Sequence, residues 1–301
     1  MANYLQLNDH SRFEPEEAAL ARYFGEGNYI PFYKKQIIQN KLKITKDDFI
    51  SGEIPTMFAA MRQLGISYKY NDYPECLQRY LHRKIWTSTM REVRQRLYDG
   101  LNGEHELDLG WFIKPKNKLK RFTGFVCNTI DDLWMAKGAG NNTELWCAEP
   151  VNFVTEFRCY FIKKSEWAKL DTHPLKDLIY FEEEVTDVYV NPYQCYAIGH
   201  YEKDYKEEDL YKVKTFIQDI LLSHRDAMYE FHPEINWPFY EFPNAFALDL
   251  GILDNGEVAV VEMNDAFSIG KYDGIDDETY AKFLITRWNE LKESSKQGEE
   301  K

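Results

Sequence analysis

The chain has 301 residues, a hydrophobic fraction of 44%, an aromatic fraction of 16% and a formal net charge of −13. These values predict a globular protein of two or three domains and exclude a disordered chain. The acidic charge disfavours nucleic acid as a partner, and because no apolar run approaches the length of a membrane span, we expect no membrane partner either.

Cysteine usage and the N-terminal sequence both indicate a cytoplasmic protein. The chain has five cysteines, an odd number without Cys-x-x-Cys spacing, and reduced, mostly buried thiols are the simplest account of them. The first residues carry no signal-peptide pattern. The sequence leaves the oligomeric state open.

The first hundred residues are predicted to form an α/β unit. Short strands are expected at residues 29–33 and 48–52, and a helix is expected over residues 54–64, where apolar residues recur at helical spacing. Residues 77–97 are predicted to form a second, arginine-rich helix. The turn-rich segment 98–103 then marks the first domain boundary.

A basic loop follows, between two predicted strands. The first strand covers residues 111–114 and is ended by Pro115, and the second begins at Phe122. Five of the eight residues from Lys114 to Arg121 are basic, which is unusual in so acidic a chain. Such a loop, followed by a Thr-Gly turn, can offer ammonium groups and backbone N–H donors to phosphate. A solvated hairpin tip would have the same composition.

Three further strands and two helices are predicted downstream, at residues 144–151, 152–162, 193–199, 207–231 and 276–291. On the strand 152–162, Glu156 and Arg158 are two residues apart and therefore share a face. They could pair with each other or line a nucleotide site.

The segment 246–265 contains the most informative single motif. Two apolar runs flank the turn sequence 254–256, which predicts an antiparallel hairpin. Glu262 and Asn264 share a face, and the hairpin can bring Asp249 beside them. Two carboxylates and one amide oxygen suit Mg²⁺, a hard cation that prefers oxygen ligands. An edge hairpin with solvated acids is the alternative interpretation.

Three features occur in one order along the chain: a Lys-Pro strand with a basic loop, a Glu-containing connector, and Asp…Glu-x-Asn on a hairpin. Together they resemble the ATP-grasp ligase superfamily over about residues 75–295. The strand order and the Phe-Thr-Gly turn are most similar to a small clade that is named for conserved arginine and lysine residues and is common in phage genomes.

The resemblance implies an α/β (α+β) protein with the ATP-grasp fold, in which the nucleotide is held between two antiparallel-sheet subdomains. Residues 1–103 would form an N-terminal α/β pre-grasp domain, and residues 104–148 a small lid subdomain with the phosphate-covering loop. Residues 149–295 would form the C-terminal subdomain with the adenine hinge and the Mg²⁺ site. Residues 296–301 would be a frayed tail.

The resemblance also assigns phosphate-binding residues. Lys114 matches the lysine that contacts the α-phosphate and the adenine side. Lys120, Thr123 and Gly124 match the flexible loop that covers the phosphates, although this loop has lysines where relatives have a glycine-rich run. Arg83 lies where many members have a phosphate-binding lysine.

The remaining nucleotide residues follow in the connector. Glu149, Pro150 and Val151 resemble the hinge whose backbone reads the adenine edge. Glu156 has the spacing of the acid that binds the ribose. Arg158, on the same strand face, is expected to bind phosphate or the substrate carboxylate, and with Lys114 and Lys120 it makes up the predicted catalytic set.

Asp249, Glu262 and Asn264 match the metal ligands of the superfamily, so the expected cofactors are ATP and Mg²⁺, with Mn²⁺ as an alternative ion. Many relatives carry a Pro-Gly turn after this motif that helps to bind substrate. This chain lacks it, and Ser268 and Lys271 in that segment are the candidate substrate-binding residues.

The reaction implied is that of an ATP- and Mg²⁺-dependent carboxylate–amine (peptide-type) ligase acting through an acylphosphate intermediate. Its partners would be a small-molecule or peptide carboxylate and an amine nucleophile, whose identities the sequence does not give. The alternatives are an ATP-dependent phosphotransferase on the same fold, a non-catalytic nucleotide-binding module, and a protein acting on RNA or DNA ends, which the net charge disfavours.

Overall fold

The computed structural model describes residues 1–69, 71–101, 110–116, 122–170, 193–201, 205–229 and 242–294. The chain divides into two compact units. Unit 1 combines Met1–Gln78 with Val154–Lys301, and unit 2 is Arg79–Phe153. Unit 2 is therefore an insertion in the sequence of unit 1.

Unit 1 begins with a small parallel sheet in the strand order β2-β1-β3. Its strands and helices are β1 (Asn3–Leu7), α1 (Pro15–Phe24), β2 (Ile30–Tyr33), α2 (Lys34–Ile38), β3 (Phe49–Ser51) and α3 (Ile54–Gln63). The expected strands at 29–33 and 48–52 and the helix over 54–64 are confirmed as β2, β3 and α3. The sequence analysis did not identify β1, α1 or α2.

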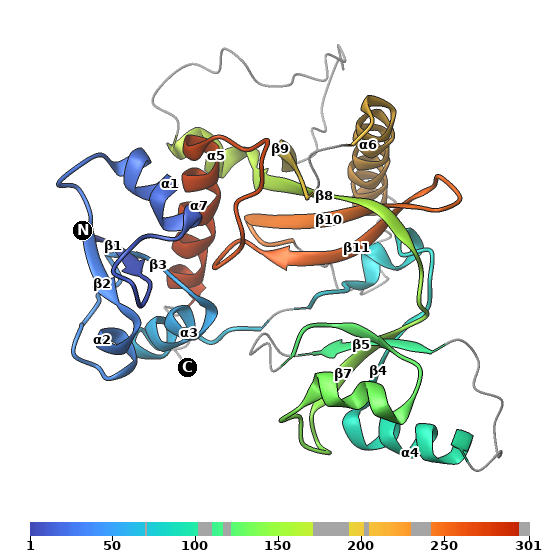
Figure 1. Cartoon of the computed structure of the whole chain (residues 1–301). Coiled ribbons are helices and arrows are strands. Elements are labelled where there is room, and N and C mark those ends of the chain that lie inside the picture. Colours follow the sequence, from blue (N-terminus) through green and yellow to red (C-terminus); the bar gives the residue numbers. More distant parts are fainter. Residues whose placement is uncertain are drawn as a thin grey trace. The chain divides into compact units, whose positions relative to one another are not determined.

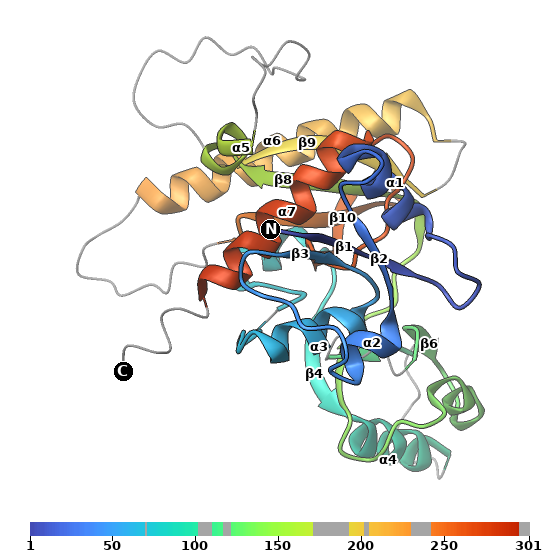
Figure 2. The same cartoon turned by 90° about the vertical axis from the view of Figure 1, so that its left-hand side faces the viewer.

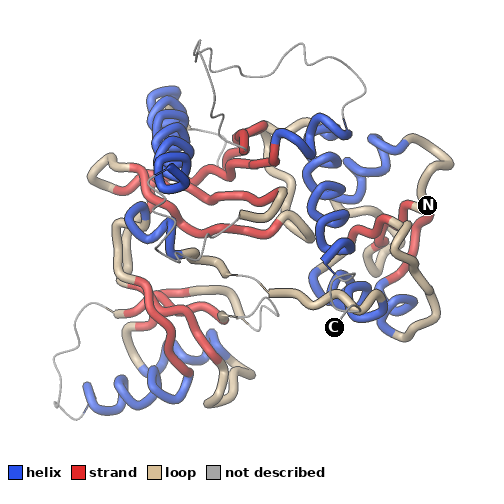
Figure 3. Tube along the Cα trace, turned by 180° about the vertical axis from the view of Figure 1, so that it is seen from behind, coloured by secondary structure: helices blue, strands red, loops and turns tan. Residues whose placement is uncertain are grey.

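The second part of unit 1 is a four-stranded sheet in the order β11-β10-β8-β9. Figure 3 shows its strands lying side by side. The elements are β8 (Phe153–Lys163), α5 (Lys164–Leu170), β9 (Tyr193–His200), α6 (Glu207–Tyr229), β10 (Ala245–Leu253), β11 (Val258–Asp265) and α7 (Asp277–Ser294). The predicted hairpin is present, because β10 and β11 pair antiparallel.

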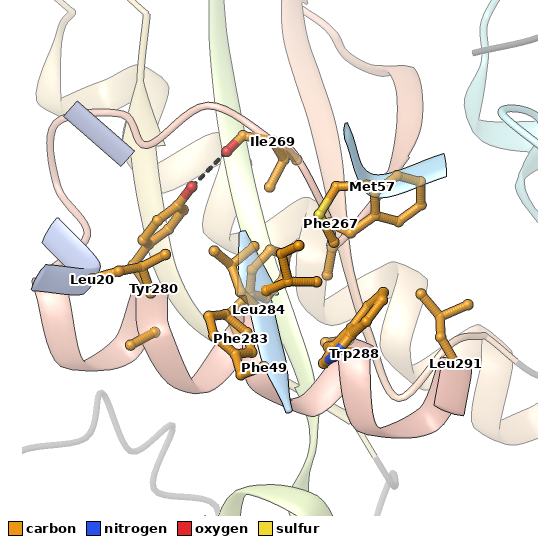
Figure 4. Packing of buried hydrophobic residues seen from close by; sticks show 14 of the residues in the cluster. Leu20, Phe49, Met57, Phe267, Ile269, Tyr280, Phe283, Leu284, Trp288 and Leu291 are labelled. Carbon is orange, nitrogen blue, oxygen red and sulfur yellow. Dashed lines mark hydrogen bonds between the residues drawn. The ribbon is translucent and has the colours of Figure 1, made fainter. Parts of the chain in front are cut away.

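Helix α7 joins the two sheets of unit 1 into one core. It stands between the small sheet and the four-stranded sheet (Figures 1 and 2). Phe283 and Trp288 are buried, and the Trp288 indole N–H donates to the carbonyl of Asp48 at 2.9 Å. The Tyr280 hydroxyl donates to the carbonyl of Ile269 at 2.6 Å (Figure 4). Because α7 has two partners, it is buried on more than one side.

The two faces of the four-stranded sheet differ in side-chain size. Ala245 and Ala247 belong to the core that contains α7, and their small side chains let the helix approach. Phe246, between them, points to the other face, where its ring stacks on Phe161 with centroids 4.9 Å apart. Helix α6 buries an apolar stripe that includes Val213.

Unit 2 is an antiparallel sheet in the order β4-β7-β5-β6, covered by α4. The elements are η1 (Glu75–Tyr80), a 3₁₀ turn at the start of the unit, β4 (Ile85–Thr89), α4 (Met90–Leu101), β5 (Trp111–Pro115), β6 (Phe125–Cys127), η2 (Ile130–Ala136) and β7 (Glu144–Ala148). Met90, Val93 and Leu97 of α4 pack with Ile113 and Cys147 of the sheet.

The expected helix over residues 77–97 is wrong. The structure has the 3₁₀ turn η1, then strand β4, and α4 begins only at Met90. The sequence Ile-Trp-Thr-Ser-Thr of β4 is rich in β-branched and aromatic residues, which favour a strand, and β4 pairs with β7. The helix then continues to Leu101, through part of the segment 98–103 that was expected to be a turn.

The compact units divide at 78/79 and 153/154 rather than at 103 and 148, because β4 and α4 pack with β5–β7. The division into pre-grasp, lid and C-terminal domains remains a prediction. All five cysteines are free, and three of them are buried, as expected. Among the residues that the structure describes, no helix has both the length and the apolar character needed to cross a bilayer.

Candidate functional site

One face of the four-stranded sheet changes from apolar to charged along its strands. Next to α7 this face carries Tyr160, Ala247 and Ala266, which are all buried. Further along the same face, side chains two residues apart replace them with charged and amide groups: Glu156 and Arg158 on β8, Asp249 on β10, and Glu262 and Asn264 on β11. The polar cluster therefore begins where the cover of α7 ends.

The two acids and the amide of the hairpin lie together. Asp249 is the register partner of Glu262. The Asn264 side-chain N–H₂ donates to Asp249 Oδ2 at 2.8 Å and to Glu262 Oε1 at 3.1 Å. The amide thus bridges the two carboxylates, and the structure brings together the three side chains as the hairpin pattern indicated. Their role as metal ligands remains a prediction.

A shift of register beside the cluster fixes this arrangement. Asp249 pairs with Glu262, but the next residue, Leu250, pairs with Val260. The shift inserts Val261 into β11. As a result Val260 is fully buried with Leu250, although it lies two residues before the polar Glu262. Such irregularities are frequent next to functional sites, where they aim a particular side chain.

Arg158 is the cation of this cluster. Its Nε and Nη2 donate to the two carboxylate oxygens of Asp249, each at 2.7 Å, and its Nη1 donates to the carbonyl of Gly270 at 3.4 Å. The guanidinium carbon lies 4.2 Å from the centroid of the Tyr272 ring. Burial alone would lower the pKa of Arg158, but the charge and hydrogen bonds of Asp249 outweigh it and raise the pKa.

The loop after β11 closes over Arg158. The Tyr160 hydroxyl donates to the carbonyl of Gly270 and accepts from the backbone N–H of Tyr272, both at 3.2 Å. Burial raises the pKa of Tyr160 to about 12, so its hydroxyl stays a donor at neutral pH. The loop thereby places the Tyr272 ring over the guanidinium.

The two candidate substrate residues lie on this loop. Ser268 has φ 50°, in the left-handed region. The Lys271 ammonium donates to the carbonyl of Ile275 at 2.6 Å and lies 3.4 Å from a carboxylate oxygen of Asp277. The backbone N–H of Lys271 donates to Glu16 at 3.2 Å. Lys271 thus ties the loop to α7 and α1, which favours a structural role for it.

The donor set of the cluster fits a hard cation. Asp249 and Glu262 supply carboxylates, and Asn264 can supply an amide oxygen if its amide makes a half-turn, which exchanges the oxygen and the nitrogen. In the described part of the chain, no three or more His, Cys, Asp or Glu side chains could hold a metal ion. A metal at this cluster would therefore need the amide of Asn264 as its third protein ligand.

In unit 2, Lys114 lies on β5 and pairs in register with Trp146. The neighbouring Ile113 points into the core under α4, so Lys114 is on the other face of that sheet. Gly124 packs against this strand, since a Cβ at position 124 would lie 2.5 Å from the Phe112 ring and 3.1 Å from Lys114 Cβ. The close approach explains the glycine.

The other candidates of the covering loop and the hinge differ in their surroundings. Thr123 is exposed, and Lys120 lies outside the described residues. The Glu149 carboxylate accepts from the backbone N–H of Lys84 at 2.9 Å, and the backbone N–H of Glu149 donates to the carbonyl of Lys84 at 3.1 Å. These bonds join the end of β7 to the start of β4. Pro150 and Val151 follow, half-buried.

Arg83 and Glu156 are positioned mainly by local contacts. Arg83 donates from Nη1 to the carbonyl of Leu81 at 3.0 Å, and its guanidinium lies 5.4 Å from the Phe153 ring centroid. Glu156 is half-buried on β8, and its carbonyl accepts from Tyr201 at 3.2 Å. The candidates thus separate into two sets, a phosphate and hinge set in unit 2 and a carboxylate–arginine set in unit 1.

A sequence comparison identifies the family to which these two sets belong. The model of a family described as an ATP-grasp domain, family 2 of its clade, matches residues 80–194 and 175–283, which together span more than half of the chain. The chain belongs to this ATP-grasp family. Its fold is the mixed α/β ATP-grasp fold with two antiparallel sheets, as the sequence resemblance implied.

Solved structures similar to this ATP-grasp chain include N5-carboxyaminoimidazole synthase from Aspergillus clavatus, with 9% identity, a TM-score of 0.47, and coverage of 94% of this chain and 76% of that chain. D-alanine–D-alanine ligase from Bacillus anthracis has 13% identity, a TM-score of 0.46, and coverage of 99% and 98%. At these values the likenesses add nothing about activity or substrate. No curated protein matches the chain.

Sequence reasoning missed three contributors to the site of this ATP-grasp chain. Gly270 and Tyr272 both contact Arg158, and Glu16 binds the loop that carries them. The pairing of Arg158 with Asp249 was also missed, because Arg158 was grouped only with Glu156. No local signal marks Tyr272, which lies on an irregular loop. The adjacent glycine was the one available indication of a close backbone approach.

Proposed function

We propose that the chain is an ATP- and Mg²⁺-dependent ligase that joins a carboxylate to an amine. One observation carries the proposal: Asp249, Glu262 and Asn264 lie in mutual hydrogen-bond contact, with Arg158 beside them. Membership of an ATP-grasp family supports it. The cluster combines a donor set for a hard cation with a buried guanidinium for an anion.

The proposed nucleotide contacts come from unit 2. Lys114 and Arg83 would bind phosphate, with Lys120, Thr123 and Gly124 in the covering loop. The backbone of Glu149, Pro150 and Val151 would read the adenine edge, and Glu156 of unit 1 would bind the ribose. The Glu149 carboxylate is engaged by Lys84, which supports a role for its backbone rather than its side chain in recognition.

Asp249, Glu262 and Asn264 would hold Mg²⁺, or Mn²⁺ in its place. When bound, the cation would neutralise charge on the triphosphate. The side chains around it would do the rest. Arg158 would bind an oxygen of the transferring phosphoryl group or of the substrate carboxylate, and the low exposure of its site would strengthen that interaction.

In the proposed reaction, a small-molecule or peptide carboxylate attacks the γ-phosphate and gives an acylphosphate and ADP. An amine nucleophile then displaces phosphate and forms the amide. This chemistry needs no nucleophilic side chain but does need in-line placement and charge neutralisation. An acylphosphate exposed to water would hydrolyse, so the site must exclude water while the intermediate exists.

The test is a screen of amino acids and peptides for stimulated ADP release from Mg-ATP, with mass spectrometry of the products. We expect an acid–amine pair that yields an amide and free phosphate in equal amounts. A phosphorylated acid that accumulates in the presence of amines would indicate a phosphotransferase instead.

Two variants link any activity to the cluster. Glu262→Gln and Asp249→Asn should each remove ATP consumption while the chain remains folded. Glu257→Gln is the matched control, because Glu257 is an exposed acid in the turn of the same hairpin. Full turnover by the Glu262→Gln chain with its true substrate would show that the metal assignment is wrong.

A further inference from the structure

The Asp249 carboxylate is already engaged by a cation of the protein itself. Arg158 contacts both of its oxygens at 2.7 Å, and Asn264 donates to one of them at 2.8 Å. Both partners of the ion pair are only 8% exposed. A divalent cation at Asp249 would meet the positive charge of Arg158 at short range and in a poorly solvated place, where repulsion is strong.

Arg158 has a second set of contacts that does not involve Asp249. Its Nη1 reaches the carbonyl of Gly270, and its guanidinium lies against the Tyr272 ring. This platform is firmly placed. Gly199 approaches it so closely that a Cβ there would lie 2.8 Å from Tyr272 Cβ, and the carbonyl of Asp273 accepts from the backbone N–H of His200 at 3.1 Å.

From these contacts we infer that Arg158 is an exchangeable counter-ion of the metal site. Without cation and substrate it neutralises Asp249. When the cation and an anionic group of the substrates bind together, Arg158 passes from Asp249 to that anion and stays against Tyr272. This inference rests on the proposed function and deepens it, because it makes cation binding depend on the anion.

The exchange has a consequence that a structural ion pair lacks. If Arg158 competes for Asp249, removing its charge must strengthen the binding of a cation in the absence of nucleotide. A pair that merely stabilised the fold would have the opposite effect or none, because its loss would loosen the arrangement of the three ligands. The sign of the change therefore distinguishes the two roles.

The experiment is a titration of the full chain with Mn²⁺ alone, without nucleotide, in which free Mn²⁺ is followed by electron paramagnetic resonance. We expect Arg158→Met to bind Mn²⁺ at least about fivefold more tightly than the unmodified chain, within the usual range for coupled sites. Arg158→Lys, which keeps the charge but loses the two-point contact, should be intermediate. Glu262→Gln should abolish the binding.

Arg22→Met is the matched control. Arg22 also makes a two-point contact with a carboxylate, that of Asp277, at 2.6 and 3.1 Å, but this pair is exposed. Its loss should leave Mn²⁺ affinity unchanged. A second readout is thermal unfolding: Mn²⁺ should raise the melting temperature of the Arg158→Met chain more than that of the unmodified chain.

The outcomes separate this inference from the proposed function. Equal or weaker Mn²⁺ binding by the Arg158→Met chain, with Glu262→Gln still abolishing it, would overturn the exchange and leave the metal site standing. Binding that is unaffected by Glu262→Gln in every chain would remove the metal site, and the exchange with it.

Discussion

Arg287 of α7 donates from Nε and Nη2 to the two carboxylate oxygens of Asp265, at 2.7 and 2.9 Å. Asp265 follows Asn264 directly on β11 and points away from it, because successive residues of a strand alternate. The Tyr68 hydroxyl also donates to Asp265, at 3.0 Å. Adjacent residues of one motif thus serve different purposes: Asn264 belongs to the polar cluster, and Asp265 fastens the strand to α7.

Arg287→Met should destabilise the chain by about 3–5 kcal/mol, because it leaves the buried Asp265 without its compensating cation. The change can be measured from the urea dependence of unfolding. Arg22→Met, which breaks the exposed pair with Asp277, should cost no more than about 1 kcal/mol. An equal loss in the two variants would contradict this explanation.

Glu17 should make the stability of unit 1 depend on pH. Burial raises the pKa of its carboxyl to about 7, with Glu16 adding to the rise and the hydrogen bond from Ser51 opposing it. Between the ordinary pKa of a glutamate and pH 7 the folded chain holds a proton that the unfolded chain has released. Stability should therefore fall as pH rises through this window, by up to about 3 kcal/mol.

Glu17→Gln tests this linkage. At pH 8 the variant should be more stable than the unmodified chain, because it has no charge to bury, whereas near pH 4 the two should be alike. The measurement is the free energy of unfolding at several pH values. Parallel pH profiles for the two chains would rule out Glu17 as the source.

Lys114→Met should weaken nucleotide binding by about 10- to 100-fold, the loss expected for one charge-assisted hydrogen bond to phosphate. Calorimetry with ADP measures it. Lys137→Met is the control, since Lys137 is exposed at the end of η2. Unchanged affinity in the Lys114→Met chain would remove Lys114 from the proposed site.

Gly124→Ala should destabilise unit 2 by about 1–3 kcal/mol, the usual cost of overpacking. The new methyl group would lie 2.5 Å from the Phe112 ring. Adding Phe112→Leu should recover part of the loss, and thermal unfolding can follow both steps. Gly140→Ala is the matched control, because a Cβ there meets nothing within 4 Å.

The hairpin of unit 1 could be predicted from the sequence because its information is local. Two apolar runs and a turn sequence specify β10 and β11, and two-residue spacing puts Glu262 and Asn264 on one face. Strand β4 was misread for a related reason. Its five residues lie between a 3₁₀ turn and a helix, and the arginines around them suggested one continuous helix.

The partner of Arg158 could not be predicted in this way. Asp249 lies 91 residues away in the sequence, and the pair forms only because β8 is the neighbour of β10. Strand order is set by the packing of whole elements, which no local pattern records. The one-residue shift that inserts Val261 is likewise invisible to a strict two-residue alternation.

The union of the first sheet with the last helix has a bearing on how the chain is made. The indole of Trp288 reaches the backbone of Asp48 across 240 positions, and Arg22 meets Asp277 across 255. On the ribosome, β1–β3 must therefore wait, with their apolar surface uncovered, until almost the whole polypeptide has emerged. Such distant contacts slow folding and expose the nascent chain to aggregation. A ribosome that stalls before α7 would release a product whose earliest-made strands have nothing to pack against.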